Sequence, residues 1–225
     1  MKALPHPVAI IWDWDNTLVD GWAAIAAGLH AAFVEHGLTP WTVAEVKARV
    51  RRSLRESFPE IFGSRWEAAR ETFYREVRAC HLQVLNPMPG AHQVLHAAAA
   101  LVPQAVNSNK QGALLRAEAE MLGWAPLFTR LVGAGDAEAD KPDPAPMHLG
   151  LAACKVSAGP AVWYVGDTGL DMMAARNAGC TAVLLGDAAH DGGLGNVHAD
   201  AVFATADGLA DYLRGLAKPG LTGQI

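Results

Sequence analysis

Blocks of apolar and polar residues alternate along most of this chain, and their periods predict both strands and helices. Short apolar runs typical of buried strands lie at residues 8–12, 104–108, 131–135, 161–166, 181–185 and 201–204. Segments with helical spacing separate most of these runs. Strands that alternate with helices form parallel sheets covered on both faces. We therefore predict an α/β protein with a doubly wound, mostly parallel, Rossmann-like sheet.

One long block after the first predicted strand shows helical spacing and no strand pattern. It contains three predicted helices, over residues 21–36, 42–55 and 64–85. Asp20 is expected to cap the first of them, and Gly37 to end it. We predict two domains, a helical insert of residues 19–87 and a sheet domain of residues 1–18 and 88–225.

Composition indicates an ordered globular protein. Hydrophobic residues make up 51% of the chain and charged residues 18%. The length of 225 residues is enough for one core domain and an inserted segment. The net charge of −5 argues against nucleic acid as a partner, because a basic face would then be expected. A small anionic substrate stays possible, since a local cationic pocket is enough to bind it.

Cysteine usage and the amino terminus bear on location. Cys80, Cys154 and Cys180 are far apart, which fits a reducing compartment and argues against a zinc site. The first residues lack the apolar region of a signal peptide, and no apolar run reaches the roughly 18 residues that a membrane span needs. We expect a cytoplasmic protein without a membrane partner, either a monomer or a homodimer.

Two carboxylates follow the first predicted strand. Asp13 and Asp15 are two residues apart in an extended segment, so their side chains point the same way. Ligands of open α/β sheets gather beyond the carboxyl ends of the strands, and both acids can therefore face one ligand. The same residues also fit a strand end followed by an Asx turn and a helix cap.

Three further segments carry chemistry at strand ends or in loops. The second strand ends in a hydroxyl, an amide and an ammonium, all able to bind an anion, from Ser108, Asn109 and Lys110. Two prolines restrict the loop that holds Lys141. Asp167 and Asp171 follow another apolar strand, four residues apart.

In this order, the four segments resemble the signature of the haloacid dehalogenase-like hydrolase superfamily. The resemblance spans about residues 8–186 and is to the phosphatase branch with a small helical cap after the first motif, which is phosphoglycolate phosphatase-like. It implies a phosphomonoester hydrolase that acts on a small phosphorylated metabolite through an aspartyl-phosphate.

The resemblance also implies roles for the motif residues. Asp13 would be the nucleophile, and Asp15 the general acid and base. Ser108 and Lys141 would stabilise the charged oxygens of the phosphoryl group in the transition state. Three more residues are expected at the bound substrate, namely Thr17, Asn109 and Lys110, with Thr17 hydrogen-bonded within the motif loop.

A hard dication is expected at the same place, because an attacking carboxylate must approach an anionic phosphate. The resemblance implies Mg²⁺, bound by Asp13, the backbone carbonyl of Asp15, and Asp167. Asp171 is expected to orient a metal-bound water or Lys141, although it also fits an ordinary acid in the first turn of a helix.

Two positions depart from the commonest family pattern. Asn16 stands where glycine is frequent, and asparagine tolerates the left-handed backbone that this loop needs. Trp14 is bulkier than the usual residue, and we interpret its indole as packing in the core or against the cap.

Other functions stay open at this point. A phosphomutase of the same superfamily is the main alternative, and a noncatalytic phosphate-sensing module is a second. Asp15 argues against the related dehalogenases and phosphonate-cleaving enzymes. Short phosphorylated acids such as 2-phosphoglycolate are the nearest substrate hypothesis.

A basic cluster in the predicted cap has two interpretations. It consists of Arg49, Arg51, Arg52 and Arg55. An arginine there would fork onto a substrate carboxylate or a second phosphate. A solvated helix face fits the same pattern.

Overall fold

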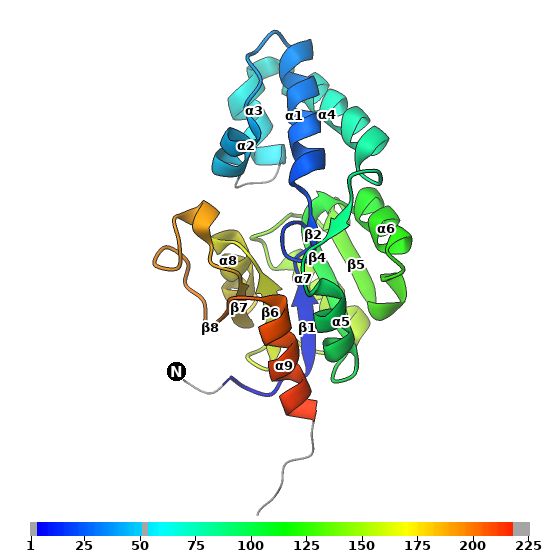
Figure 1. The fold of residues 1–225 in the computed structure, drawn as a ribbon, viewed down its shortest axis with the longest axis vertical. Helices are drawn as coiled ribbons and strands as arrows, with labels where there is room; N and C mark the ends of the chain where they lie inside the picture. Colours follow the sequence, from blue (N-terminus) through cyan, green and yellow to red (C-terminus); the bar gives the residue numbers. More distant parts are fainter. Residues whose placement is uncertain (1–3, 51–53, 218–225) are drawn as a thin grey trace, which may run out of the picture.

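The structure of the protein, a computed structural model, describes residues 4–50 and 54–217 (Figure 1). Six parallel strands form one sheet in the order β5-β4-β1-β6-β7-β8. Their bounds are Ala9–Trp12 (β1), Gln104–Gln111 (β4), Arg130–Ala134 (β5), Val162–Gly166 (β6), Thr181–Leu185 (β7) and Ala201–Phe203 (β8). The predicted doubly wound α/β fold is confirmed.

Helices cover both faces of the sheet, because alternate strand residues point to opposite faces. In β1, Ile10 and Trp12 join one buried cluster and Ala9 and Ile11 join the other. The first cluster includes residues of α5 (Ala91–Ala99), α6 (Gly112–Met121) and α9 (Ala206–Ala217). The second includes residues of α7 (Ala145–Cys154) and α8 (Gly169–Asn177). All four side chains of β1 are therefore buried between helices.

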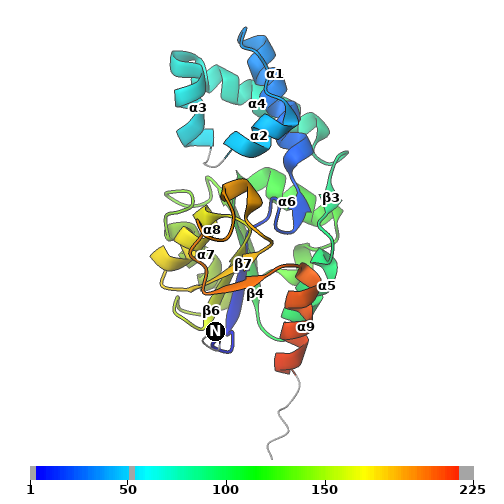
Figure 2. The same ribbon diagram turned by 60° about the vertical axis from the view of Figure 1, so that its left-hand side comes forward.

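A separate group of helices lies beyond one end of the sheet (Figures 1 and 2). It consists of α1 (Trp22–Glu35), α2 (Val43–Arg49), α3 (Leu54–Phe62) and α4 (Trp66–Cys80). Their aromatic side chains form a third buried cluster, which includes Phe33, Phe58, Phe62 and Phe73. The group therefore has its own core.

Two very short strands connect this helical group to the sheet domain. β2 (Val19–Asp20) pairs with β3 (Asn86–Pro87) in an antiparallel ribbon that the sequence pattern did not predict. The chain thus enters and leaves the helical group at one place. The exact domain division, residues 19–87 against 1–18 and 88–225, stays a prediction.

One helix prediction was wrong. Residues 42–55 were predicted as a single helix, but α2 ends at Arg49 and Val50 has an extended backbone. The helical hydrogen-bond ladder cannot continue through an extended residue. α3 then runs to Phe62, although no helix was predicted over residues 56–62. Arg51 and Arg52 of the basic cluster lie outside the described residues.

The remaining turns of helix are short. Three 3₁₀ segments lie at Gly63–Arg65, Ala125–Leu127 and Ala189–Asp191. Within residues 4–50 and 54–217, none of the helices has the length and apolar character that crossing a membrane requires.

Candidate active site

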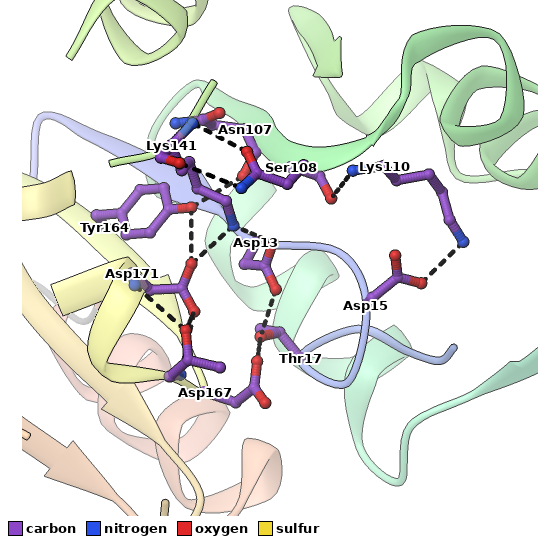
Figure 3. A network of polar contacts seen from close by, with 12 residues as sticks. Asp13, Asp15, Thr17, Asn107, Ser108, Lys110, Lys141, Tyr164, Asp167 and Asp171 are labelled. Carbon is purple, nitrogen blue, oxygen red and sulfur yellow. Dashed lines mark hydrogen bonds and ion pairs between the residues drawn. The ribbon is translucent and has the colours of Figure 1, made fainter. Parts of the chain in front are cut away.

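The predicted catalytic residues meet at the carboxyl end of the sheet (Figure 3). Asp13 follows β1, Ser108 lies near the end of β4, and Asp167 follows β6. β1 is hydrogen-bonded to both β4 and β6, so these strand ends are neighbours. All three side chains are buried, as is that of Lys141 from the loop between β5 and α7.

Lys141 joins two of the carboxylates. Its Nζ donates to Asp13 Oδ1 at 2.5 Å and to Asp171 Oδ1 at 2.7 Å. Burial lowers the pKa of Lys141, but the charges of Asp13 and Asp171 raise it more, and the pKa lies well above its ordinary value. The ammonium therefore stays charged and holds Asp13 in place.

Asn109 holds the backbone of Lys141. The amide Oδ1 of Asn109 accepts from the Lys141 N–H at 2.9 Å, and its Nδ2 donates to the Lys141 carbonyl at 3.2 Å. Asn109 also lines the pocket over the site. Its role at the substrate stays a prediction, and the observed contacts give it a second task, positioning Lys141.

Thr17 lies between two of the predicted metal ligands. Its hydroxyl has Asp167 Oδ1 at 2.8 Å and Asp13 Oδ2 at 3.3 Å. The side chain is buried. Through Thr17, the loop after β1 thus contacts the residue that follows β1 and the residue that follows β6.

Three buried acids can share one cation. Asp13, Asp167 and Asp171 each offer a carboxylate oxygen, and these atoms all lie within 4.8 Å of one another. Burial raises the pKa of Asp13 to about 7, against the opposing charge of Lys141. Burial, with the charges of Asp171 and Asp13, raises the pKa of Asp167 well above its ordinary value. A set of three carboxylates offers only oxygen ligands, and such ligands fit a hard dication.

Asp171 already has several donors. Its Oδ1 accepts from Lys141 and, at 3.2 Å, from the hydroxyl of Tyr164. Its Oδ2 accepts from the N–H and the hydroxyl of Thr168, which caps α8. These contacts fit both earlier expectations, since Asp171 orients Lys141 and also serves in the first turn of a helix.

Asp15 contacts a different cation from Asp13. Lys110 Nζ lies 2.8 Å from Asp15 Oδ1, and the same ammonium lies 2.8 and 2.9 Å from the two oxygens of Glu118 (Figure 3 shows the first contact). Burial raises the pKa of Asp15, and the charge of Lys110 opposes this rise. Lys110 lines the pocket, as expected for a residue at the substrate, but its ammonium is paired with two acids.

The loop between these acids has the expected left-handed turn. Asn16 has a φ of 66°, a conformation that asparagine tolerates. Its Oδ1 accepts from the backbone N–H of Gly21 at 3.3 Å. The departure from glycine at this position therefore preserves the loop.

Sequence reasoning missed Glu118 and His81. Trp14 Nε1 donates to Glu118 Oε2 at 2.7 Å, and His81 Nδ1 lies 2.8 Å from Glu118 Oε1. The Trp14 indole thus packs in the core, as interpreted, and also hydrogen-bonds. A signal for Glu118 was present, because it follows Leu114 and Leu115 at helical spacing on an apolar helix face.

The pocket over the site lies between the sheet domain and the helical group. Asp13, Asp15, Ser108 and Lys141 line its core side. The helical group lines its other side with mostly apolar residues, namely Trp22, Ile25, Val50, Leu54, Phe73, Tyr74 and Val77. Leu114 of α6 adds an apolar side chain from the sheet domain. No arginine of the described residues lines this pocket.

The two described arginines of the basic cluster are exposed. Arg49 pairs with Glu45 at 3.3 Å and lies over the ring of Trp41. Arg55 lies 3.9 Å from Asp140. These contacts favour the solvated-face interpretation for Arg49 and Arg55.

The sequence profile of the haloacid dehalogenase-like hydrolases matches residues 10–185. The chain belongs to this family. The matched residues include every motif residue that the sequence analysis singled out.

Two curated relatives of this hydrolase are phosphoglycolate phosphatases. This chain is 32% identical to a phosphoglycolate phosphatase from Chromobacterium violaceum, and the match covers 81% of this chain and 86% of that one. It is 26% identical to a phosphoglycolate phosphatase from Cereibacter sphaeroides, over 92% and 98%.

Solved structures share the fold of this hydrolase. A haloacid dehalogenase-like hydrolase from Streptococcus pneumoniae has a TM-score of 0.79 at 19% identity, covering 92% of this chain and 98% of that one. A putative phosphoglycolate phosphatase from Lactobacillus plantarum has a TM-score of 0.80 at 16% identity, covering 92% and 99%. At these identities the likeness concerns the fold alone.

Proposed function

We propose that this phosphatase hydrolyses a small phosphomonoester through an aspartyl-phosphate on Asp13, with Mg²⁺ as cofactor. The observation that carries the proposal is the buried contact of 2.5 Å between Lys141 Nζ and Asp13 Oδ1, at the strand end that also bears Asp15. A carboxylate held by a fixed ammonium can face an anionic phosphate, because the charge of Lys141 offsets both anions.

The first half of the reaction transfers the phosphoryl group to the enzyme. A carboxylate oxygen of Asp13 bonds to phosphorus while the bond from phosphorus to the leaving oxygen breaks. Lys141 and Ser108 donate to the phosphoryl oxygens as their negative charge redistributes. Asp15 gives its proton to the leaving oxygen, and the alcohol departs.

The second half restores the enzyme. Asp15, now ionised, takes a proton from a water molecule as the water oxygen bonds to phosphorus. The bond from phosphorus to Asp13 breaks, which releases inorganic phosphate and the free carboxylate. Burial, which raises the pKa of Asp15, suits a carboxyl that must both give and take a proton.

Asp13, Asp167 and the backbone carbonyl of Asp15 would hold the Mg²⁺ ion. When bound, this cation offsets the charge of phosphate and carboxylates during attack. The closeness of the Asp13, Asp167 and Asp171 oxygens, within 4.8 Å, supports this assignment. Asp171 then keeps Lys141 oriented through their contact of 2.7 Å.

We further propose a short phosphorylated acid, 2-phosphoglycolate, as the substrate. The name phosphoglycolate phosphatase, carried by two relatives at identities of 26% and 32%, supports it. A reaction in the cytoplasm fits the reducing environment inferred from the cysteines.

The test is phosphate release with Mg²⁺ from a panel of phosphorylated metabolites that includes 2-phosphoglycolate. Asp13→Asn should abolish release, and Asp211→Asn, at an exposed position on α9, should leave it unchanged. Near-normal release by Asp13→Asn would contradict the nucleophile. Turnover of a bisphosphorylated sugar without net phosphate release would favour the phosphomutase alternative.

A further inference from the structure

A buried carboxylate that the proposed mechanism does not use lies where the sheet domain meets the helical group. Glu118 of α6 is 1% exposed. Both of its oxygens contact Lys110, at 2.8 and 2.9 Å. Oε2 also accepts from the Trp14 indole at 2.7 Å, and Oε1 lies 2.8 Å from His81 Nδ1.

These partners come from distant parts of the chain. Trp14 stands between Asp13 and Asp15, Lys110 belongs to β4, and His81 directly follows α4 at the exit from the helical group. A buried charge without its partners is costly, whereas a fully satisfied network favours one arrangement. Glu118 thus holds three segments in a single relative position.

Lys110 carries this constraint to the active site. Its ammonium contacts Glu118 and, at 2.8 Å, Asp15 Oδ1, and its side chain is only 8% exposed. The same ammonium thus contacts both acids, and a shift of Glu118 would displace the donor that Asp15 contacts. Glu118 is therefore linked to the Asp15 carboxylate through Lys110, although Glu118 does not line the pocket over the site.

We propose that Glu118 is a positioning residue, which holds Lys110 against Asp15 and so aims the carboxyl group that protonates the leaving oxygen. This inference rests on the proposed function, in which Asp15 is the general acid. Trp14 and His81 fix Glu118 in turn. The alternative is that Glu118 only satisfies buried donors and contributes to folding.

The variant Glu118→Gln separates these roles, because it keeps the shape of the side chain and removes the charge. For an alkyl phosphate, whose leaving oxygen needs a proton, we expect kcat to fall about 10- to 100-fold with little change in KM. For p-nitrophenyl phosphate, whose leaving group departs as an anion, only hydrolysis of the aspartyl-phosphate still uses Asp15, and we expect a smaller loss. A purely structural role predicts equal losses on the two esters.

Two comparisons sharpen the result. Glu120→Gln, at an exposed position on the same helix, should leave both activities unchanged. In an Asp15→Asn background, Glu118→Gln should add no further loss, because its effect passes through Asp15. If Glu118→Gln does not fold, the double variant Lys110→Met and Glu118→Gln removes both charges of the pair and should show the same dependence on the leaving group.

Each outcome decides. Equal losses on both esters, or a full additional loss in the Asp15→Asn background, would overturn the positioning role while leaving the phosphatase intact. Failure of the wild-type enzyme to release phosphate from either ester would overturn the proposed function and this inference with it.

Discussion

The backbone of Gly21 lies so close to the side chain of Asp15 that a methyl group on residue 21 would overlap the carboxylate. Gly21 directly precedes α1 and has a φ of −85° and a ψ of −12°, which alanine adopts without strain. One glycine at the start of the helical group therefore gives Asp15 the room that its contact with Lys110 needs.

The Gly21→Ala variant should consequently be folded but impaired. The added methyl displaces the Asp15 carboxyl from its position, and misplacement of a catalytic group by about 1 Å costs roughly 100-fold. Steady-state kinetics on an alkyl phosphate should show this loss in kcat. Gly215→Ala in α9 is the matched control, because a methyl there meets open space. Normal activity of Gly21→Ala would contradict the importance of this contact.

The loss of activity on replacing Asp15 should depend on the leaving group of the substrate. Asp15→Asn removes the acid and base but keeps the backbone carbonyl proposed as a metal ligand. On alkyl phosphates we expect a loss of about 10²- to 10⁴-fold, the usual contribution of a general acid or base. The loss should be smaller on p-nitrophenyl phosphate, and phosphate assays on both esters give the comparison. Equal losses would argue against the acid role.

Replacing Asp167 should have opposite effects on the protein with and without metal. Burial and the neighbouring acids hold the pKa of Asp167 well above its ordinary value of 3.8. A carboxyl with a raised pKa in the folded protein loses its stabilising effect as pH rises above the unfolded pKa. At pH 7 without metal, Asp167→Asn should therefore melt at a higher temperature than the wild type. The difference should vanish near pH 3.

Addition of Mg²⁺ should reverse this order. A ligand at a concentration about 100 times its Kd stabilises the folded protein by roughly 2.7 kcal/mol. Only the wild type should gain this stabilisation from Mg²⁺. Differential scanning calorimetry with and without Mg²⁺ measures both effects. An equal Mg²⁺ response in the two proteins would remove Asp167 from the metal site.

Arg49 and Arg55 should contribute little to substrate selectivity. Exposed ion pairs contribute about 0–1 kcal/mol. Arg49 pairs with Glu45, and the exposed Arg55 lies 3.9 Å from the largely buried Asp140, a long contact. Arg49→Ala and Arg55→Ala should keep substrate selectivity within about threefold, under roughly 1 kcal/mol. The ratio of kcat/KM for 2-phosphoglycolate and a neutral alkyl ester measures it. A tenfold rise in KM for 2-phosphoglycolate alone would restore a binding role.

The sheet was predictable because β1, β6 and β7 are continuous apolar runs, buried on both faces. The convergence of Asp13, Ser108 and Asp167 at one edge was predictable for the same reason, since each follows or ends such a run. The short ribbon of β2 and β3 was not, because two residues per strand are too few to show a period. The break at Val50 was also missed, because apolar spacing continues across it.

The partners of Lys110 lay beyond local reasoning. A lysine beside Ser108 and Asn109 fits an anion site, and nothing within a few residues indicates that Asp15 and Glu118 neutralise it. Its partners are 95 and 8 residues away in sequence. Glu118 itself stands out only as an acid on an apolar helix face, a pattern that indicates a buried partner without naming it.

The ribbon of β2 and β3 also bears on how such an enzyme can diversify. Because the two connections to the helical group are hydrogen-bonded to each other, that group is inserted into the sheet domain at a single place. One uninterrupted stretch of coding sequence can thus be exchanged or lengthened while the strand order around Asp13 is preserved. Substrate choice and phosphoryl chemistry are thereby free to evolve at different rates.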